Sequence, residues 1–205
     1  MPKSWVRERK RDYYYRKAKE EKYRSRAAYK LLQADKKYRF IKKGGIVVDL
    51  GAAPGGWLQV VRKIVGDEGF VLGVDLERIK PLEADNVYTL VADVGGPETQ
   101  KHVEASLPSL ADVVISDVSP NISGVWEVDH ARQIDLAYES LKLASTILRE
   151  GGNFFVKVFQ GDLFQDFVKK VKRLFVRVEI MKPKASRTKS AEIFVLGIGF
   201  KKANN

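Results

Sequence analysis

The chain has 205 residues, of which 44% are hydrophobic and 31% charged, a balance typical of one globular domain with a full-sized core. It carries a net charge of +11 and no cysteine, which excludes disulfides, cysteine nucleophiles and thiolate metal sites. The two histidines, His102 and His130, are too few for a histidine-based metal site, so we expect no metal. No apolar run approaches the roughly 18 residues of a membrane span, and the N-terminus lacks an apolar signal region. We therefore expect a cytoplasmic protein without membrane contact.

The pattern of apolar residues predicts helices that alternate with short strands. Residues 24–37 have apolar side chains at helical spacing, whereas residues 46–50 form a continuous apolar run, typical of a strand buried on both faces. A long amphipathic helix is expected over residues 129–149, closed by Gly151-Gly152. In chain order, the predicted helices are 24–37, 56–65, 98–106, 129–149 and 162–174. The predicted strands are 46–50, 70–75, 87–92, 113–117, 153–159, 176–181 and 192–200, and a basic segment over 182–190 joins the last two.

Positive charge is concentrated at both ends of the chain. Residues 1–43 hold 17 Lys and Arg against 5 Asp and Glu, residues 169–205 hold 11 against 2, and the middle is acidic. Tyrosines are interleaved with the basic residues of the first segment, a mixture that suits single-stranded or looped RNA. We therefore expect an RNA partner. We also expect residues 1–22 to be a basic extension of a single domain that spans residues 23–205.

Acidic residues follow the predicted strands. Strands alternating with helices imply an α/β fold with a doubly wound parallel sheet, in which ligands bind beyond the carboxyl ends of the strands. An acid falls at or just past the end of each of the first four strands, where it is useful, although it would be costly in a core. These residues are Asp49, Asp75, Asp93 and Asp117. One or two could cap a following helix instead, but four in succession favour a binding site.

A glycine-rich turn, Asp49–Trp57, follows the first predicted strand. Gly51 and Gly55 permit backbone conformations that allow close approach of a ligand. The spacing matches neither the G-x-G-x-x-G turn of dinucleotide folds nor the P-loop, which favours a cofactor without phosphates. Asp75 lies about where an acid holds ribose hydroxyls, and Asp93 is placed to contact the base. The turn therefore predicts a small adenosine-containing cofactor.

Four stretches of the chain resemble the FtsJ/RrmJ (RlmE) family of RNA ribose 2′-O-methyltransferases. They are RSRAAYKL (24–31), VVDLGAAPGGW (47–57), SDVSPNISG (116–124) and KPKASRTKSAEIFVLGIGFK (182–201), and their order and spacing agree with the family. The resemblance covers nearly the whole chain. It implies a Rossmann-like methyltransferase fold with a mostly parallel seven-stranded sheet and an antiparallel last strand. One conservative departure is Asp117-Val118-Ser119-Pro120, where bacterial members usually have Asp-Met-Ala-Pro.

The resemblance also implies the residues of the site and their ligands. The family's catalytic tetrad falls on Lys30, Asp117, Lys157 and Glu192. Its contacts with S-adenosylmethionine fall on Gly55, Trp57, Asp75, Asp93 and Asp117, and the glycine turn adds Gly51. The implied substrate is a uridine of large-subunit ribosomal RNA, free or in the ribosomal subunit, with the ribose of a tRNA anticodon loop second. A monomer is favoured.

The chemistry expected of these residue types agrees with that assignment. A ribose 2′-hydroxyl is a weak nucleophile at neutral pH, and a neutral lysine amine can remove its proton if the lysine pKa is lowered. Lys157, inside the apolar run of the fifth strand, is the better candidate for this base, and a nearby positive charge on Lys30 would lower its pKa. Asp117 would orient Lys157 and the methionine end of the cofactor, and Glu192 would position Lys30 or the substrate.

Two other functional classes stay open. One is a methyltransferase that acts on a base or a protein side chain. Base amino methylation commonly uses an Asn/Asp-Pro-Pro-aromatic motif after the fourth strand, which this chain lacks, and cytosine C5 chemistry needs a cysteine. The other class is a non-catalytic RNA-binding protein that retains the cofactor fold, and the intact tetrad argues against it.

Overall fold

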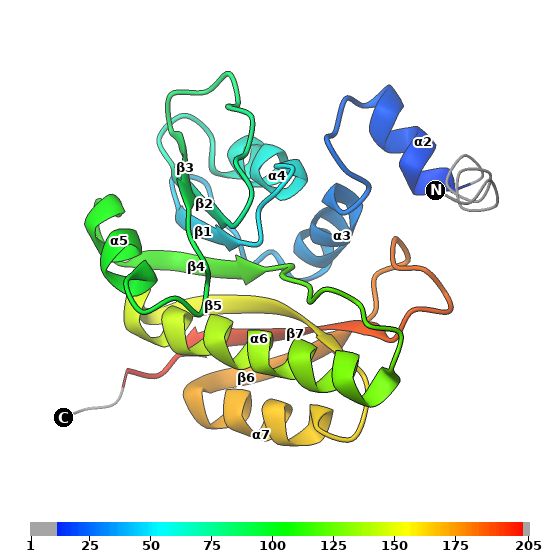
Figure 1. Cartoon of the computed structure of the whole chain (residues 1–205). Helices are drawn as coiled ribbons and strands as arrows, with labels where there is room; N and C mark the ends of the chain where they lie inside the picture. The colour runs from blue at the N-terminus through cyan, green and yellow to red at the C-terminus, as the bar shows by residue number, and fades with distance from the viewer. Residues whose placement is uncertain (1–11, 203–205) are drawn as a thin grey trace.

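Seven strands form one mixed sheet in the order β3-β2-β1-β4-β5-β7-β6 (Figure 1). The computed structural model describes residues 12–202. The strands are β1 (Ile46–Leu50), β2 (Phe70–Asp75), β3 (Val87–Val91), β4 (Ala111–Ser116), β5 (Leu148–Phe159), β6 (Phe175–Met181) and β7 (Glu192–Phe200). The helices are α2 (Tyr13–Glu20), α3 (Ala28–Tyr38), α4 (Gly56–Val65), α5 (Thr99–Ser106), α6 (Trp126–Ile147) and α7 (Phe164–Leu174).

The directions of the strands agree with the prediction. The neighbours from β3 to β5 pair in parallel, and β7 pairs antiparallel with β5 and with β6. The chain reverses its order of strands between β1 and β4, which is where such sheets bind ligands. The prediction of a doubly wound α/β sheet with an antiparallel last strand is therefore confirmed. Within residues 12–202, no helix is long and apolar enough to cross a membrane.

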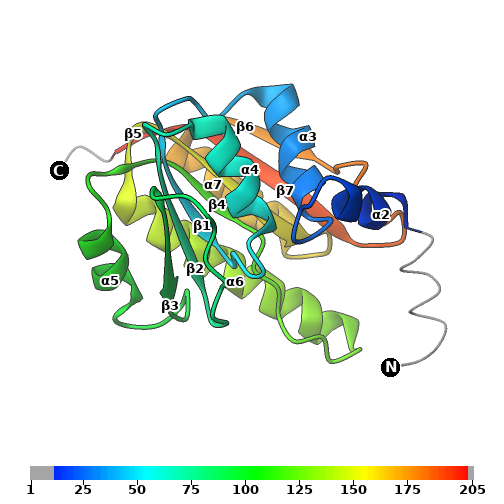
Figure 2. The ribbon, with the colours of Figure 1, turned by 90° about the horizontal axis from the view of Figure 1, so that it is seen from above.

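Helices cover both faces of the sheet, and each face has its own apolar core (Figure 2). Successive residues of a strand point to opposite faces, so Val47 packs against α3 and α4, whereas Val48 packs on the side of α6 and α7. The strands in the middle of the sheet are thus apolar on both faces, as their continuous runs predicted.

Several predicted helix boundaries are wrong, among them the start of α6, which begins at Trp126 and not at residue 129. α3 begins at Ala28, because residues 24–27 form a turn in which the backbone N–H of Arg24 donates to Gln59. α6 ends at Ile147, so Gly151-Gly152 does not close this helix and lies inside β5. Gly151 has φ of +77° at an irregularity where β5 carries extra residues opposite β4. The glycines therefore mark a bulge in a strand, a use of glycine that the sequence pattern did not separate from a helix end.

The N-terminal part of the described chain is a helix that packs on the domain. Of the predicted extension over residues 1–22, residues 1–11 lie outside the described residues, and α2 covers most of the rest. Ala18 of α2 is buried against Tyr29 of α3 and Ala185 of the segment between β6 and β7. The hydroxyl of Tyr29 donates to Glu21 at 2.8 Å. Helix α2 and the basic segment over 182–190 therefore lie at the same end of the sheet (Figure 1).

Candidate active site

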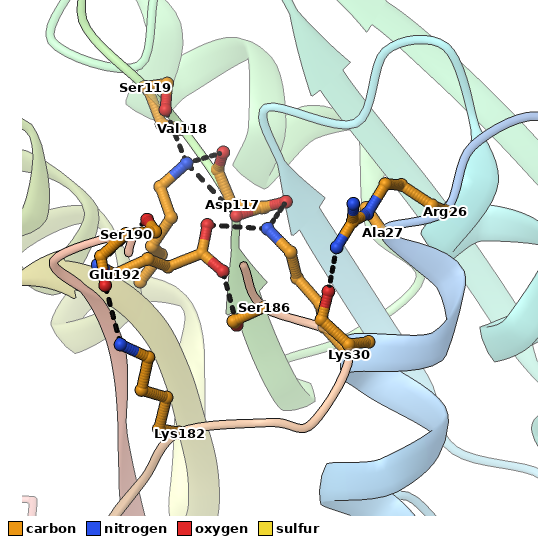
Figure 3. Close-up of polar contacts among 12 residues, drawn as sticks. Arg26, Ala27, Lys30, Asp117, Val118, Ser119, Lys182, Ser186, Ser190 and Glu192 are labelled. Atoms are coloured by element: carbon orange, nitrogen blue, oxygen red, sulfur yellow. Dashed lines mark hydrogen bonds and ion pairs between the residues drawn. The ribbon is translucent and has the colours of Figure 1, made fainter. Parts of the chain in front are cut away.

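The four residues of the predicted tetrad meet at the carboxyl edge of the sheet. Asp117 follows β4, and its carboxylate lies between two lysines, with Oδ1 3.1 Å from Lys157 Nζ and Oδ2 3.5 Å from Lys30 Nζ. Lys30 projects from α3 and also pairs with Glu192, whose Oε2 is 2.6 Å away. Because β7 runs antiparallel to β5, its first residue Glu192 lies at the edge where β5 ends. Figure 3 shows this chain of opposite charges, in which Asp117 and Glu192 both face Lys30.

Lys157 is the most buried member, with 4% of its surface exposed. Its ammonium donates to the backbone carbonyl of Asp117 at 2.9 Å and to Oγ of Ser119 at 2.5 Å, and it forms an ion pair with the Asp117 carboxylate. The ammonium thus has three oxygen partners. A buried ammonium without such partners would be strongly destabilising, so these contacts explain how the apolar strand β5 accommodates a lysine.

The charges of Asp117 and Lys30 stabilise each other. Burial by itself raises the pKa of Asp117, but the ammonium groups of Lys157 and Lys30 outweigh burial and hold this pKa below its ordinary value. Burial likewise lowers the pKa of Lys30, but the carboxylates of Asp117 and Glu192 outweigh it and raise this pKa. At neutral pH Asp117 is therefore a carboxylate and Lys30 an ammonium, which leaves Lys157 as the candidate base among the two lysines.

A pocket of about 510 Å³ opens next to the tetrad, at the carboxyl ends of the first four strands. Its lining includes four of the predicted cofactor residues, Gly51, Asp75, Asp93 and Asp117. Its volume is in the range of sites that hold small ligands. The carboxylate of Asp75 accepts the backbone N–H groups of Ala53 at 2.9 Å and Glu77 at 2.8 Å. A carboxylate has about four lone-pair positions, so Asp75 can accept further hydrogen bonds from a ligand.

Two other predicted cofactor residues do not line this pocket. Trp57 is 3% exposed, its indole N–H donates to the carbonyl of Ala27 at 2.7 Å, and its ring packs against Phe155. Gly55 precedes α4 with φ of 103°, and a Cβ there would lie 2.8 Å from the guanidinium of Arg24. Both residues thus pack against the segment before α3 and do not face the pocket. Their contacts with a cofactor stay predictions, which this arrangement does not support.

Asp49 was expected at the edge of the sheet, and this expectation is wrong. It lies inside β1 with no exposed surface, and neither carboxylate oxygen has a hydrogen-bond partner among residues 12–202. Burial raises the pKa of Asp49 well above its ordinary value, and the negative charges of Asp117 and Asp75 raise it further. The side chain is therefore a neutral acid beneath the glycine turn, because an unpaired buried carboxylate is costly.

Three residues that the sequence analysis did not select also shape the site. Ser119 accepts from Lys157, and the buried Ser186 donates its hydroxyl to Oε1 of Glu192 at 2.6 Å. The side-chain amide of Gln133, on α6, donates to the backbone carbonyl of Lys157 at 3.1 Å and to the loop after β4 at 3.2 Å. The serines lie in two of the recognised motifs, but a serine in a polar loop carries no signal of its partner. A glutamine on a helix carries none either.

The acids of the site are engaged with lysines and backbone N–H groups. Among residues 12–202, no group of three or more His, Cys, Asp and Glu side chains is arranged to hold a metal ion. The expectation that the protein works without a metal stays a prediction.

Comparisons with known proteins give the family. The sequence model of the FtsJ-like methyltransferases matches residues 23–200. The protein named Ribosomal RNA large subunit methyltransferase E of Methanocaldococcus jannaschii is 53% identical over 197 residues, which cover 95% of this chain and 80% of that protein. The protein of the same name from Methanothrix thermoacetophila is 56% identical over 187 residues, which cover 91% and 72%.

Solved structures agree. The crystal structure of a Plasmodium falciparum protein, described as a ribosomal RNA methyltransferase, has a TM-score of 0.77 and 28% sequence identity. The match covers 87% of this chain and 98% of that one. Because the family model spans most of the chain and relatives at more than half identity cover nearly all of it, the chain belongs to the FtsJ-like methyltransferase family.

Proposed function

We propose that the protein transfers a methyl group from S-adenosylmethionine to a ribose 2′-hydroxyl of RNA. The observation that carries this proposal is the chain of paired charges from Lys157 through Asp117 and Lys30 to Glu192, at the edge of the acidic pocket. Membership of the family supports methyl transfer. The names of the relatives support large-subunit ribosomal RNA as substrate, and the resemblance of the motifs favours a uridine.

The residues of the pocket fit S-adenosylmethionine. Asp75, at the end of β2, has lone pairs for two ribose hydroxyls, and Asp93 offers an acceptor for the amino group of adenine. Asp117 places negative charge at the end of the pocket that meets the tetrad, where a cationic methionine end would be favoured. When bound, the cofactor supplies a methyl group on a positively charged sulfur.

In this proposal the Lys157 ammonium first releases one proton to solvent, and the neutral amine then accepts the proton of the 2′-hydroxyl. A neutral lysine amine has two N–H donors and one lone pair. The backbone carbonyl and the carboxylate of Asp117 hold the two donors, which leaves the lone pair for the incoming hydroxyl. Ser119 occupies the third position now and must give it up, which a hydroxyl can do because it both donates and accepts. Ser119 is therefore a positioning residue.

Lys30 has a different role from Lys157. Its raised pKa keeps Lys30 charged. A charged lysine can hold the ribose or phosphate of RNA, but it cannot act as the general base. Glu192, fixed by the hydroxyl of Ser186, keeps the Lys30 ammonium in place. Much of the rate enhancement comes from the alignment of the 2′-oxygen with the methyl carbon, and the paired charges provide a rigid frame for it.

The test is to incubate the protein with methyl-labelled S-adenosylmethionine and unmethylated large-subunit ribosomal RNA, and then to identify the labelled nucleoside. The expected product is 2′-O-methyluridine. A label on a base would contradict ribose methylation. Transfer to tRNA and not to ribosomal RNA would favour the alternative substrate, the ribose of a tRNA anticodon loop. Cofactor and RNA binding without any transfer would show the non-catalytic alternative.

A further inference from the structure

Two hollows adjoin each other on the side of the tetrad where α2 and α3 lie. The outer hollow, of about 420 Å³, is lined by α2, the segment before α3, Pro54 and Arg187. The inner hollow, of about 260 Å³, includes Lys30 and Glu192 in its lining. Ser25, Arg26 and Arg187 line both. The outer hollow therefore adjoins the hollow that reaches Lys30 and Glu192, and no predicted cofactor residue lines either of them.

Positive charge exceeds negative charge in the outer hollow. Its charged lining residues are Lys19, Arg24, Arg26, Arg187 and Asp12. Asp12 is engaged, since it pairs with Arg26 and accepts the backbone N–H of Tyr15 at the start of α2. Arg24 donates to backbone carbonyls, 2.7 Å from that of Pro81. The side chain of Arg187 is exposed, and no hydrogen bond or ion pair engages its guanidinium within residues 12–202. The hollow thus has a net positive charge with one arginine available to a ligand.

Arg26 and Arg187 stand together in the wall that the two hollows share. Burial lowers the pKa of Arg26, and the positive charge of Arg187 lowers it further, while Glu192 partly opposes both. The guanidinium of Arg26 already pairs with Asp12 and donates to the carbonyl of Ala185. Arg187 is therefore the one that can bind an anion here, and the planar fork of arginine matches a phosphate. Both arginines line the inner hollow together with Lys30, where the ribose to be methylated is expected.

Aromatic rings complete the outer hollow. Tyr15 of α2 and Tyr23 line it, and the ammonium of Lys19 lies 5.2 Å from the centroid of the Tyr15 ring. Basic groups that follow a backbone, combined with rings that stack on bases, are the features by which proteins hold single-stranded nucleic acid. The volume is sufficient for one nucleotide.

We propose that the outer hollow binds the nucleotide next to the methylated one in single-stranded RNA. The phosphate that links the two nucleotides binds Arg187, beside Arg26, and the neighbouring base lies against Tyr15 and Tyr23. This inference rests on the proposed function, because it takes the target ribose to lie at Lys30 and Lys157.

The first test compares two variants that each remove one exposed positive charge from the same segment. Arg187→Ala changes the shared wall, whereas Lys189→Ala is the matched control, because Lys189 lines neither hollow. Affinity for a single-stranded RNA oligonucleotide is measured at several salt concentrations. Arg187→Ala should weaken binding about tenfold and flatten the salt slope by about 0.7. Lys189→Ala should do neither. Equal effects of both variants would reduce the hollow to part of a general basic surface and overturn the inference.

The second test places the base. Tyr15→Leu keeps an apolar side chain without the ring, and should weaken binding about fivefold or more with an unchanged salt slope. This loss should vanish on RNA that lacks the base next to the methylated nucleotide, and persist on RNA that lacks a base four nucleotides away. A loss that is the same on both RNAs would overturn the placement.

The two proposals fail in different ways. Suppose that the wild type transfers methyl groups but that neither Arg187→Ala nor Tyr15→Leu has a selective effect. This result would support the proposed function and reject the outer hollow as the site of the neighbouring nucleotide. The absence of transfer by a protein that binds RNA and cofactor would remove the proposed function. The thermal midpoint and cofactor affinity of each variant should equal those of the wild type.

Discussion

Asp117 allows two lysines to share one site. One of its carboxylate oxygens pairs with Lys157 and the other with Lys30, so a negative charge lies between the two ammonium groups. Glu192 adds a second carboxylate on the far side of Lys30. Two positive and two negative charges therefore alternate in a largely buried row. Loss of any one member would leave an uncompensated buried charge, which is strongly destabilising.

A pair of substitutions separates the role proposed for Lys157, the base, from the role proposed for Ser119, a positioning residue. Lys157→Ala should lower the single-turnover rate of methyl transfer by about 100-fold or more, the scale of general base catalysis, without loss of S-adenosylmethionine affinity. Ser119→Ala removes one hydrogen bond worth about 0.5–1.5 kcal/mol, so its rate should fall by no more than about tenfold. Rates of Lys157→Ala within a few-fold of the wild type would exclude Lys157 as the base.

The buried acid Asp49 predicts a pH dependence of stability. Because its pKa is raised in the folded protein, the carboxyl favours folding below its ordinary value of 3.8, and this contribution is lost as pH rises toward the folded pKa. Asp49→Asn cannot titrate. The free energy of unfolding of the variant minus that of the wild type should therefore increase above about pH 4, by at most about 1.4 kcal/mol per pH unit. Urea unfolding of both proteins from pH 4.5 to 8 measures it, and a difference that does not change with pH would contradict a raised pKa.

The sequence was most informative where a residue's type is costly in its predicted place. A lysine inside the apolar run of β5 needs partners, which singled out Lys157, and the structure supplies three oxygen partners. Trp57 was harder to interpret, because a tryptophan in a turn can contact a ligand or pack in a core. Its partner, the carbonyl of Ala27, comes from a turn that the apolar pattern assigned to a helix.

At the scale of elements, periodicity placed every strand and most helices, and it failed where tertiary contacts decide. The helix α4 and the strands β2 and β7 have the predicted bounds. No helix was predicted at α2, because its tyrosines and charges leave only Ala18 buried. It is stabilised by contacts with Tyr29 and Ala185, distant in sequence, which a local pattern does not contain.

Removal of α2 should therefore cost stability as well as RNA affinity. A variant that lacks residues 1–22 loses the hydrogen bonds of Tyr29 with Glu21 and of Gln33 with Tyr14, and it exposes Tyr29. Two hydrogen bonds correspond to about 1–3 kcal/mol of unfolding free energy. Removal of residues 1–11 alone is the control, since it leaves these contacts in place. Equal unfolding free energies of the two truncations would show that α2 does not stabilise the domain, and that residues 23–205 fold without it.

At the scale of the whole molecule, the fold joins charges that lie far apart in the sequence. The two basic ends appeared separately in the composition, but α2 and the segment between β6 and β7 meet beside the tetrad (Figure 2). The acidic residues of the middle of the chain line the pocket on the other side of Asp117. The edge of the sheet thus has an acidic half suited to a cationic cofactor and a basic half suited to RNA, and the Asp117–Lys30 ion pair joins the two.

Methyl transfer to RNA with a single 2′-deoxynucleotide at the modified position tests this assignment most directly. Two RNAs that are identical except for that one 2′-hydroxyl are compared under single-turnover conditions with labelled S-adenosylmethionine. The deoxy substitution removes the oxygen that Lys157 is proposed to deprotonate and leaves the base and the phosphates in place, so binding should change little. The arrangement predicts full transfer to the ribose RNA and none to the deoxy RNA. Undiminished transfer to the deoxy RNA would contradict it, because the methyl group would then be going to a base.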